Sequence, residues 1–548
     1  MLPGSGSRTP RPESSAPTAD GARVLPAPGD PAGGVRTEFA SILFGADEPP
    51  RALPAEELAA VFHDLHLDGI VAAATEGRDQ YDLVGFYGRL LPSVAAVRFR
   101  QEVLRDLEGA AVRAAIDAFA GAMRRVRALE SQGAKLSHPL QRAWYRLEST
   151  LEYTAAAGAL AEALTDDRVA SGGLRGFRDF LRAYLGSTAF RDLAGVSRSI
   201  SEALARVRYG VFVRKLRVSV EPLQGERDYS AAVAATFERF RQGATTGPRA
   251  APRDLYPEVN HVEEQILDRV VLLFPDVFRR LVDFERRYRT FVHPTVERFD
   301  REVQFYVGYL FAIAPLRESG RAFCYPDVSE LSKSERANDT FDLALALQLR
   351  RGGATVVPND FALEGPERVL VVSGPNQGGK TTFARTFGQL HFLAALGLPV
   401  PGDGVRLALA DHVFPHFERE EHIEDLRGKL MDELVRIREI FERATARSVV
   451  VLNESFATTT VDDAERLGTR VLEEILRRDL VAVYVTFLDE LSRLGPGTVS
   501  MVSTVAPDDA SRRTFRVVRQ RADGRAYAAA VANRYGLSAE RVRERIRP

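Results

Sequence analysis

A glycine-rich stretch in the second half of the chain carries the clearest chemistry. Residues 369–382 read Val-Leu-Val-Val-Ser-Gly-Pro-Asn-Gln-Gly-Gly-Lys-Thr-Thr and match the pattern G-x-x-x-x-G-K-[ST] at every fixed position. The backbone N–H groups of such a turn, together with the N-terminus of the helix after it, bind phosphate oxygens. Lys380 is expected to reach the β- and γ-phosphates, and the Thr381 hydroxyl is expected to ligate Mg²⁺. The stretch therefore predicts a nucleoside triphosphate site made by Gly374, Pro375, Asn376, Gln377, Gly378, Gly379, Lys380, Thr381 and Thr382.

A second part of this site is expected at the end of a neighbouring strand. Residues 448–452 form an apolar run that leads into Asn453 and Glu454. Glu454 is the expected catalytic residue, because a carboxylate there can orient or deprotonate the attacking water. Asn453 stands where an Asp is normally expected, so it can hydrogen-bond a metal-bound water but brings no charge to Mg²⁺. The three threonines at 458–460 precede a predicted helix over 463–477, and a helix cap accounts for one of them.

The composition indicates a globular protein. Hydrophobic residues make up 45% and charged residues 27% of the 548 residues, enough for two to four domains with their own cores. The single cysteine, Cys324, excludes a disulfide within the chain and a cysteine-based zinc site. The first residues lack the layout of a signal peptide, and the longest apolar stretch, near 306–316, is too short to cross a bilayer. We expect a soluble, cytoplasmic protein without a membrane partner.

The hydrophobic pattern divides the chain into three parts. Residues 1–36, rich in Pro, Ala and Gly, are expected to be a disordered tail. Residues 37–320 are predicted to be mostly helical, and an apolar seam from Val277 to Leu310 predicts one extended helix there. Residues 321–548 alternate short apolar runs with helical segments, which predicts an α/β domain with a mostly parallel sheet. Its strands are expected at 354–357, 369–373, 448–452, 480–486, 498–504 and 514–519.

One segment of the helical part breaks the helical pattern. Residues 211–221 alternate apolar and polar or basic side chains with a period of two, which predicts a strand or a hairpin arm with a basic face. Arg214, Lys215 and Arg217 on this arm are candidates for contacts with DNA phosphates.

Several motifs together resemble the MutS family. Residues 321–548 resemble its ATPase domain, an ABC-type P-loop NTPase domain, and residues 37–320 resemble its core and lever domains. The resemblance is carried by Val357–Asp360, Gly374–Thr381, Leu430–Leu434, Asn453–Glu454, Thr458–Asp463, Val485–Phe487, Asp523–Tyr527, Ala532–Leu537 and Val97–Val103. The resemblance implies ATP and Mg²⁺ as cofactors, DNA as a partner, and a homodimer formed through the ATPase domains. It also implies that Thr459 and Thr460 face the γ-phosphate of the partner, with Asp463 capping the helix behind them.

The sequence departs from the family pattern at positions that bear on ATP hydrolysis and on mismatch recognition. Asn453 replaces an Asp, and Phe487 replaces a His thought to sense the γ-phosphate. About 40 low-complexity residues stand where mismatch-reading relatives carry a front domain with a Phe-x-Glu wedge. The chain thus resembles a short, front-truncated MutS-related protein that does not read mismatches in its own right, and we expect slow ATP hydrolysis.

Three functions remain open on this basis. The first is an ATP-controlled dimer that binds DNA in repair or recombination. The second is a nucleotide-dependent dimeric scaffold with weak hydrolysis and no direct DNA binding, which Asn453 and Phe487 favour. The third is a dimeric ATPase of the ABC or chromosome-maintenance type. The absence of a Leu-Ser-Gly-Gly-type signature and of a long coiled-coil insertion argues against this third function.

Overall fold

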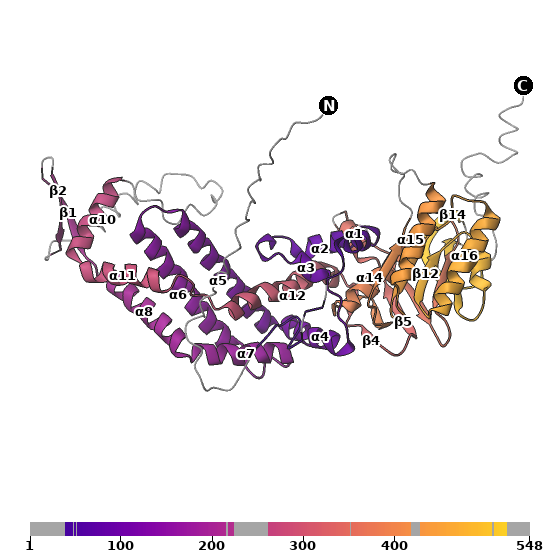
Figure 1. The fold of residues 1–548 in the computed structure, drawn as a ribbon, viewed down its shortest axis with the longest axis horizontal. Coiled ribbons are helices and arrows are strands. Elements are labelled where there is room, and N and C mark those ends of the chain that lie inside the picture. The colour runs from indigo at the N-terminus through magenta and orange to yellow at the C-terminus, as the bar shows by residue number, and fades with distance from the viewer. Residues whose placement is uncertain are drawn as a thin grey trace, which may run out of the picture.

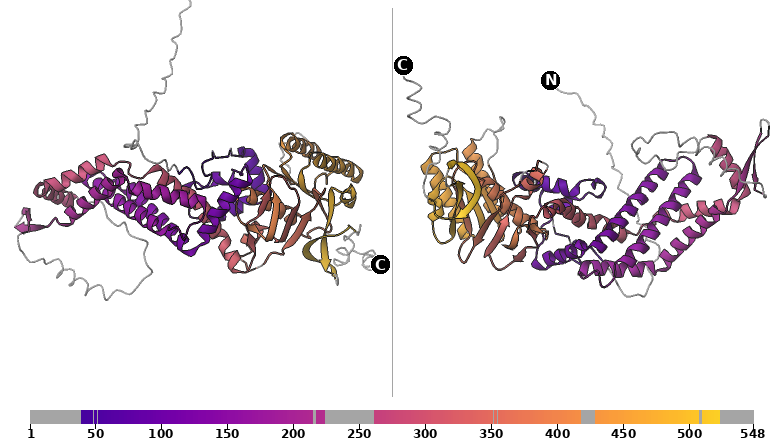
Figure 2. Two further views of the ribbon diagram at one scale, coloured as in Figure 1. Left: turned by 90° about the horizontal axis from the view of Figure 1, so that it is seen from below. Right: turned by 180° about the vertical axis from the view of Figure 1, so that it is seen from behind.

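The chain has an elongated shape, with helices at one end and a sheet-containing part at the other (Figure 1). The computed structural model describes residues 39–47, 49–50, 52–214, 217–223, 261–350, 352–353, 355–417, 428–506 and 509–522. Figure 2 shows the same separation of the two parts from below and from behind. The motifs expected at 523–527 and 532–537 lie outside the described residues.

The first part is built almost entirely from helices, as predicted. They are α1 (Ala55–Asp64), α2 (Leu67–Thr75), a 3-10 turn (Asp79–Tyr81), α3 (Val84–Tyr87), α4 (Val94–Glu108), α5 (Ala110–Lys135), α6 (Pro139–Ala163), α7 (Gly172–Leu185), α8 (Thr188–Ala205), α10 (His261–Leu273), α11 (Pro275–Arg287) and α12 (Pro294–Glu318). Across the described ranges, none of the helices is by itself long and apolar enough to span a membrane; the bent pair of α1 and α2 meets that test only together.

The extended helix predicted from the apolar seam is wrong, because the chain breaks between α11 and α12. Pro294 is the first residue of α12 and has no N–H to continue a preceding helix. His293 before it has extended dihedral angles, φ −71° and ψ 132°, and its Nδ1 accepts a hydrogen bond from the Thr295 N–H at 3.1 Å. The seam is therefore shared by two helices that meet at a capped turn.

The predicted hairpin arm is confirmed and lies at the end of the molecule farthest from the sheet (Figure 1). Strands β1 (Tyr209–Arg214) and β2 (Arg217–Pro222) are antiparallel, with Val211 opposite Val220 and Arg214 opposite Arg217. Arg217 is exposed. Lys215 and the side chain of Arg214 lie outside the described residues.

The second part contains a six-stranded sheet with the order β10-β11-β12-β7-β13-β14. All neighbouring strands in it are parallel except β13 and β14. The mostly parallel sheet predicted for this part is therefore confirmed. Its elements are β7 (Val369–Ser373), α14 (Lys380–Ala395), β10 (Val413–His416), α15 (Lys429–Arg443), β11 (Val449–Asn453), α16 (Val461–Arg477), β12 (Val481–Val485), a 3-10 helix (Asp489–Arg493), β13 (Thr498–Ala506) and β14 (Asp509–Arg519).

Smaller sheets, which the hydrophobic pattern did not predict, flank the large one. They have the orders β4-β9-β5-β6 and β3-β8. The strand expected at 354–357 is wrong: residues 355–358 form no strand, and β6 starts after Pro358, which has no N–H for a ladder. The additional elements are β3 (Phe323–Cys324), β4 (Asp327–Ser329), β5 (Glu335–Thr340), α13 (Leu343–Arg350), β6 (Asn359–Leu363), β8 (Val400–Pro401) and β9 (Asp403–Ala408).

Alternate residues of each central strand belong to different cores, as a strand with both faces covered requires. In β7, Leu370 and Val372 pack in the cluster that contains α14, whereas Val369 and Val371 pack in the cluster that contains α15 and α16. Helices therefore cover both faces of the sheet. The loop that leaves β7 emerges at its carboxyl edge, between the two layers.

The helical part and the sheet part are joined by a continuous hydrophobic core. The end of α14 is fastened to the helical part by two direct bonds: Leu91 N–H donates to Ala395 O at 2.8 Å, and Arg100 Nη1 donates to Leu396 O at 2.9 Å. Arg100 is fully buried, and its Nε donates to Leu43 O at 3.0 Å. The division into domains at residue 320 thus stays a prediction, because packing continues across it.

Helices α2 and α12 approach each other closely at Gly308, and this contact contributes to the stability of the fold. A Cβ on Gly308 would lie 2.1 Å from the Ala74 carbonyl oxygen, so Gly308→Ala must push two helices apart. We expect a loss of about 1–3 kcal/mol, seen as a lower midpoint of thermal unfolding. Gly158→Ala in α6 is the matched control: nothing lies within 4 Å of its Cβ position, and it should stabilise the helix by up to about 1 kcal/mol. Equal midpoints for the two variants would contradict this packing.

Candidate functional site

The glycine-rich loop connects the central strand β7 to the N-terminus of α14, the context that phosphate binding requires. Gly374 and Gly379 have φ values of +115° and +92°, which L side chains rarely adopt. Ser503 of β13 fastens the loop, since its Oγ donates to Gly378 O at 2.7 Å. A Cβ on Gly378 would lie 2.2 Å from that same Oγ. The glycines thus allow both the turn and its contact with β13.

Lys380 is folded back onto the loop. Its side chain is 5% exposed, and Nζ donates to Gly374 O at 3.0 Å, to Pro375 O at 3.3 Å and to Asn376 Oδ1 at 3.2 Å. Glu454 Oε1 lies 3.8 Å from Nζ. Burial lowers the pKa of the Lys380 ammonium group, and the nearby Glu454 carboxylate partly offsets that effect. The expected phosphate-binding lysine and the expected catalytic carboxylate are therefore adjacent.

The turn after β11 holds Glu454 in a strained backbone conformation. Glu454 and Phe456 have φ values of +54° and +65°, each of which costs on the order of 1–3 kcal/mol for a residue other than glycine. Two bonds support this turn: Glu454 N–H donates to Val485 O at 2.9 Å, and Phe456 N–H donates to the buried Glu433 Oε2 at 3.0 Å. Strain of this kind persists where the surroundings over-determine it, and here it holds the Glu454 carboxylate within 4 Å of Lys380.

Two oxygen donors in this region suit Mg²⁺. Thr381 lines the pocket in front of the loop. Asn453 is 8% exposed, and its Oδ1 has no hydrogen-bond partner among the described residues. Buried oxygens without a partner are uncommon, and a hydroxyl with an amide oxygen is the type of donor that Mg²⁺ or its water ligands accept. The residues present therefore fit this ion.

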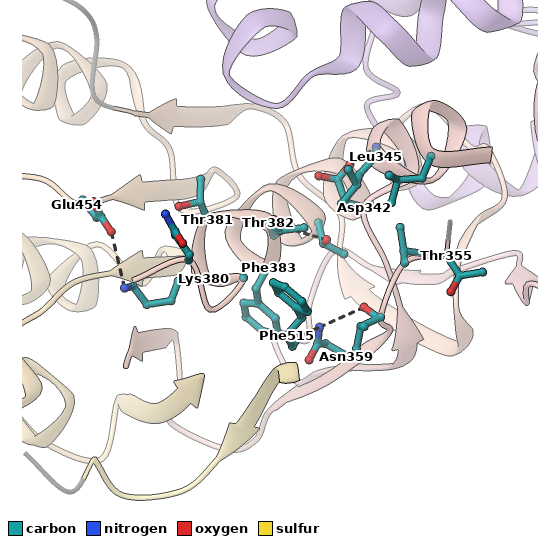
Figure 3. A pocket seen from close by; sticks show the side chains of 16 residues that line it. Asp342, Leu345, Thr355, Asn359, Lys380, Thr381, Thr382, Phe383, Glu454 and Phe515 are labelled. Carbon is teal, nitrogen blue, oxygen red and sulfur yellow. Dashed lines mark hydrogen bonds and ion pairs between the residues drawn. The ribbon is translucent and has the colours of Figure 1, made fainter. Parts of the chain in front are cut away.

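A pocket of about 360 Å³ extends from the loop towards α13. Figure 3 shows Glu454 and Lys380 at one end, Leu345 and Thr355 at the other, and Phe515 between them. Its lining comprises Asp342, Leu345, Leu349, Thr355, Val356, Val357, Asn359, Gln377, Gly379, Lys380, Thr381, Thr382, Phe383, Thr386, Glu454 and Phe515. The end beside the loop is polar and the far end mostly apolar, as a site for a phosphate chain and a flat base requires.

Sequence reasoning missed Phe515 and the residue that positions it. Phe515 belongs to β14, has a φ of +59° and is 50% exposed at the pocket. Asn359 holds it from β6, since Asn359 Nδ2 donates to Phe515 O at 3.2 Å and Val517 N–H donates to Asn359 Oδ1 at 2.7 Å. No local pattern marks either role, because the bond from Asn359 to Phe515 joins segments 156 residues apart.

The threonine segment differs from the expectation in one respect. The helix cap is Thr460, not Asp463: Thr460 Oγ1 accepts from Asp463 N–H at 3.3 Å and donates to Asp463 Oδ2 at 3.0 Å. Asp463 is the third helical residue, and its carboxylate accepts from the capping hydroxyl. Thr459 is half-buried and Thr458 is exposed. A contact of Thr460 with a partner subunit would therefore compete with its capping bond.

Other expected residues lie away from the pocket. Phe487, two residues after β12, is 50% exposed and does not line it. The DNA candidates Arg214, Lys215 and Arg217 belong to the hairpin arm at the opposite end of the molecule (Figure 1).

Comparison with known proteins identifies related segments. Residues 370–545 match the family model of MutS domain V. The chain is 32% identical over 186 residues to Endonuclease MutS2 of Thermus thermophilus, which covers 34% of this chain and 25% of that protein. It is 30% identical over 304 residues to DNA mismatch repair protein MutS of Symbiobacterium thermophilum, which covers 53% of this chain and 34% of that protein. The chain thus spans about a quarter to a third of the length of these curated relatives.

The cap of α16 yields a local test. Thr460→Ala removes the side-chain oxygen that accepts the Asp463 N–H, a loss that costs typically about 1 kcal/mol. Amide hydrogen exchange over residues 461–464 should then quicken by roughly fivefold, because the first turn opens more often. Thr458→Ala, which removes an exposed hydroxyl outside the helix, is the control and should leave this exchange unchanged. Equal rates in both variants would exclude Thr460 as the effective cap.

Proposed function

The chain belongs to the MutS family, and on this premise we propose that it is an ATPase that acts on DNA in repair or recombination as an ATP-controlled dimer. The observation that carries the proposal is the position of Lys380 in a glycine-rich loop, 3.8 Å from the Glu454 carboxylate and at one end of a pocket of nucleotide size. Lys380 now donates to loop carbonyls, and the β- and γ-phosphates of ATP replace these acceptors. The base then lies against Phe515, between the loop and the apolar end of the pocket.

Hydrolysis would be carried by a small set of side chains. Glu454 orients the attacking water and takes its proton, while Lys380 balances the charge that develops on the phosphates. Thr381 and Asn453 would hold Mg²⁺, directly or through water, and the bound ion would neutralise phosphate charge. Asn453 has no charge to hold Mg²⁺, and Phe487, which does not line the pocket, brings no polar group to the γ-phosphate, so turnover is slow.

The same two residues support a second candidate function. A nucleotide-dependent scaffold needs ATP binding and dimerisation but little hydrolysis. The neutral amide of Asn453 and the exposed Phe487 side chain suit that function as well. DNA binding separates the two candidates.

Helix α14 is the element through which bound nucleotide acts on the helical part. Its first residue, Lys380, meets the phosphates, and the carbonyls at its end accept bonds from Leu91 and Arg100. We propose that closure of the loop around ATP shifts α14 and thereby changes the angle of the helices that carry the hairpin arm.

The first test concerns the nucleotide. Lys380→Ala removes the cation that faces the β- and γ-phosphates, so the Kd for ATP should rise by about tenfold or more in a titration with fluorescent ATP. Lys135→Ala, at the exposed end of α5, is the control for loss of a lysine and should bind as the unmodified chain does. Unchanged affinity in Lys380→Ala would remove the basis of the proposal.

The second test concerns the dimer. Glu454→Gln should bind ATP without hydrolysing it, and sedimentation with ATP and Mg²⁺ should show a dimer. Adding Thr459→Ala to this variant should weaken the dimer if Thr459 meets the partner's phosphates, whereas Thr458→Ala should not. A protein that stays monomeric with ATP in the Glu454→Gln background would contradict the composite site.

The third test concerns DNA. Many arginines of the helical part are paired with carboxylates, such as Arg125 with Glu152 and Arg127 with Asp300, so the hairpin arm is the better candidate. Replacing Arg214, Lys215 and Arg217 with Ala should weaken binding to all duplexes alike. It should also reduce the slope of log K against log salt by about 1 for each DNA phosphate that the variant no longer neutralises.

The matched control removes three exposed arginines of α16, at the other end of the molecule: Arg466, Arg470 and Arg477. This variant should bind DNA as the unmodified chain does. No binding of any duplex by the unmodified chain at low salt would favour the scaffold.

A further inference from the structure

A bulge in the β13–β14 hairpin places a second cation beside the phosphate-binding loop. The register passes from Ser503 opposite Val517 to Val505 opposite Arg513, so two steps along β13 correspond to four along β14. The extra residues of β14 bend towards the loop, where a Cβ on Gly379 would lie 3.6 Å from Phe515 Cα. Bulges of this kind commonly re-aim side chains next to active sites.

The bulge is held in place from two sides. Asn359 bonds to the backbone on both sides of Arg516, through Phe515 O and Val517 N–H. Thr504 and Thr514 also pair across the hairpin, with their hydroxyl oxygens 2.6 Å apart. The position of the bulge is thus fixed by side chains of β6, β13 and β14.

Arg513, at the start of this bulge, contacts the loop at the same residue as Lys380 does. Arg513 Nε donates to the Asn376 carbonyl oxygen at 3.1 Å, while Lys380 Nζ donates to Asn376 Oδ1 at 3.2 Å. The charge of Arg513 also acts on Lys380, lowering the pKa of its ammonium group in addition to the larger effect of burial. The positively charged side chains of Lys380 and Arg513 therefore both contact Asn376, and the Glu454 carboxylate lies beside Lys380.

The contact of Arg513 with Asn376 indicates which phosphate group Arg513 would contact. The lysine of such a loop binds the β- and γ-phosphates, so Asn376, which Lys380 touches, lies at the γ end of the phosphate chain. Repulsion between two cations is relieved when an anion lies between them. A guanidinium group also offers paired N–H donors that match phosphate oxygens.

We propose that Arg513 is a phosphate-contacting residue that binds the γ-phosphate from within the same chain. The inference rests on the proposed ATP site and adds to it a group that distinguishes ATP from ADP. Arg513 supplies a γ-phosphate contact that the apolar side chain of Phe487 does not provide. Because Arg513 and Phe515 share one bulge, a single element would bind both ends of the nucleotide.

The test compares ATP with ADP in three proteins: the unmodified chain, Arg513→Ala and Arg516→Ala. Arg516 is exposed on the same bulge and is the control for loss of an arginine there. In Arg513→Ala the Kd for ATP with Mg²⁺ should rise by about tenfold, as expected for loss of a charge-assisted hydrogen bond, and the Kd for ADP by much less. Arg516→Ala should leave both constants unchanged.

Two outcomes would overturn the inference. Equal weakening of ATP and ADP in Arg513→Ala would show that Arg513 only shapes the loop through the Asn376 carbonyl. Unchanged affinity for both nucleotides would show that it contacts no phosphate. In either case the proposed function stands if Lys380→Ala raises the Kd for ATP by about tenfold or more, whereas failure of the unmodified chain to bind ATP would end both proposals.

Discussion

The buried guanidinium group of Arg100 is the interaction on which the joined architecture depends. A buried charge is costly unless hydrogen bonds replace water. Arg100 Nε and Nη1 donate to the carbonyls of Leu43 and Leu396, while its Nη2 has no hydrogen-bond partner among the described residues. Burial lowers its pKa to about 10, so it remains charged at neutral pH. Because Leu396 follows directly after α14, this charge keeps the end of the nucleotide helix against the helical part. Gly397 reinforces the contact, since a Cβ there would lie 3.0 Å from Arg100 Cβ.

A second connection runs from the middle of α14 to the pocket wall. Gln389 is buried; its Nε2 donates to Leu65 O at 2.9 Å and to Asp342 Oδ1 at 2.8 Å, and its Oε1 accepts from Leu343 N–H at 2.9 Å. Asp342 lines the pocket, and Arg385 pairs with it at 3.2 Å. One amide therefore joins the helical part, the nucleotide helix and the wall of the pocket. A movement of the pocket wall would disturb all of these hydrogen bonds together, because each partner is buried or bonded to another residue.

The sequence predicted what depends on short-range pattern, namely the mostly parallel sheet, the hairpin arm and the glycine-rich loop before a helix. Features that depend on distant partners were missed. Phe515 reaches the pocket because Asn359, far away in sequence, holds a bulge in β14. The break before Pro294 was missed because the apolar spacing continues across it. The sequence pattern allowed one of the threonines to cap α16 and the family resemblance implied Asp463; only the geometry assigns the cap to Thr460. The roles of the site residues in catalysis and in the partner's site stay predictions.

We propose that nucleotide binding at the loop is transmitted to the helical part through α14. Amide hydrogen exchange with and without ATP and Mg²⁺ measures this directly. We predict slower exchange at residues 374–382 and, in the same experiment, a changed rate at residues 89–100, where Leu91 N–H bonds to Ala395 O. Slower exchange confined to the loop and β7, with residues 89–100 unaffected, would contradict the claim.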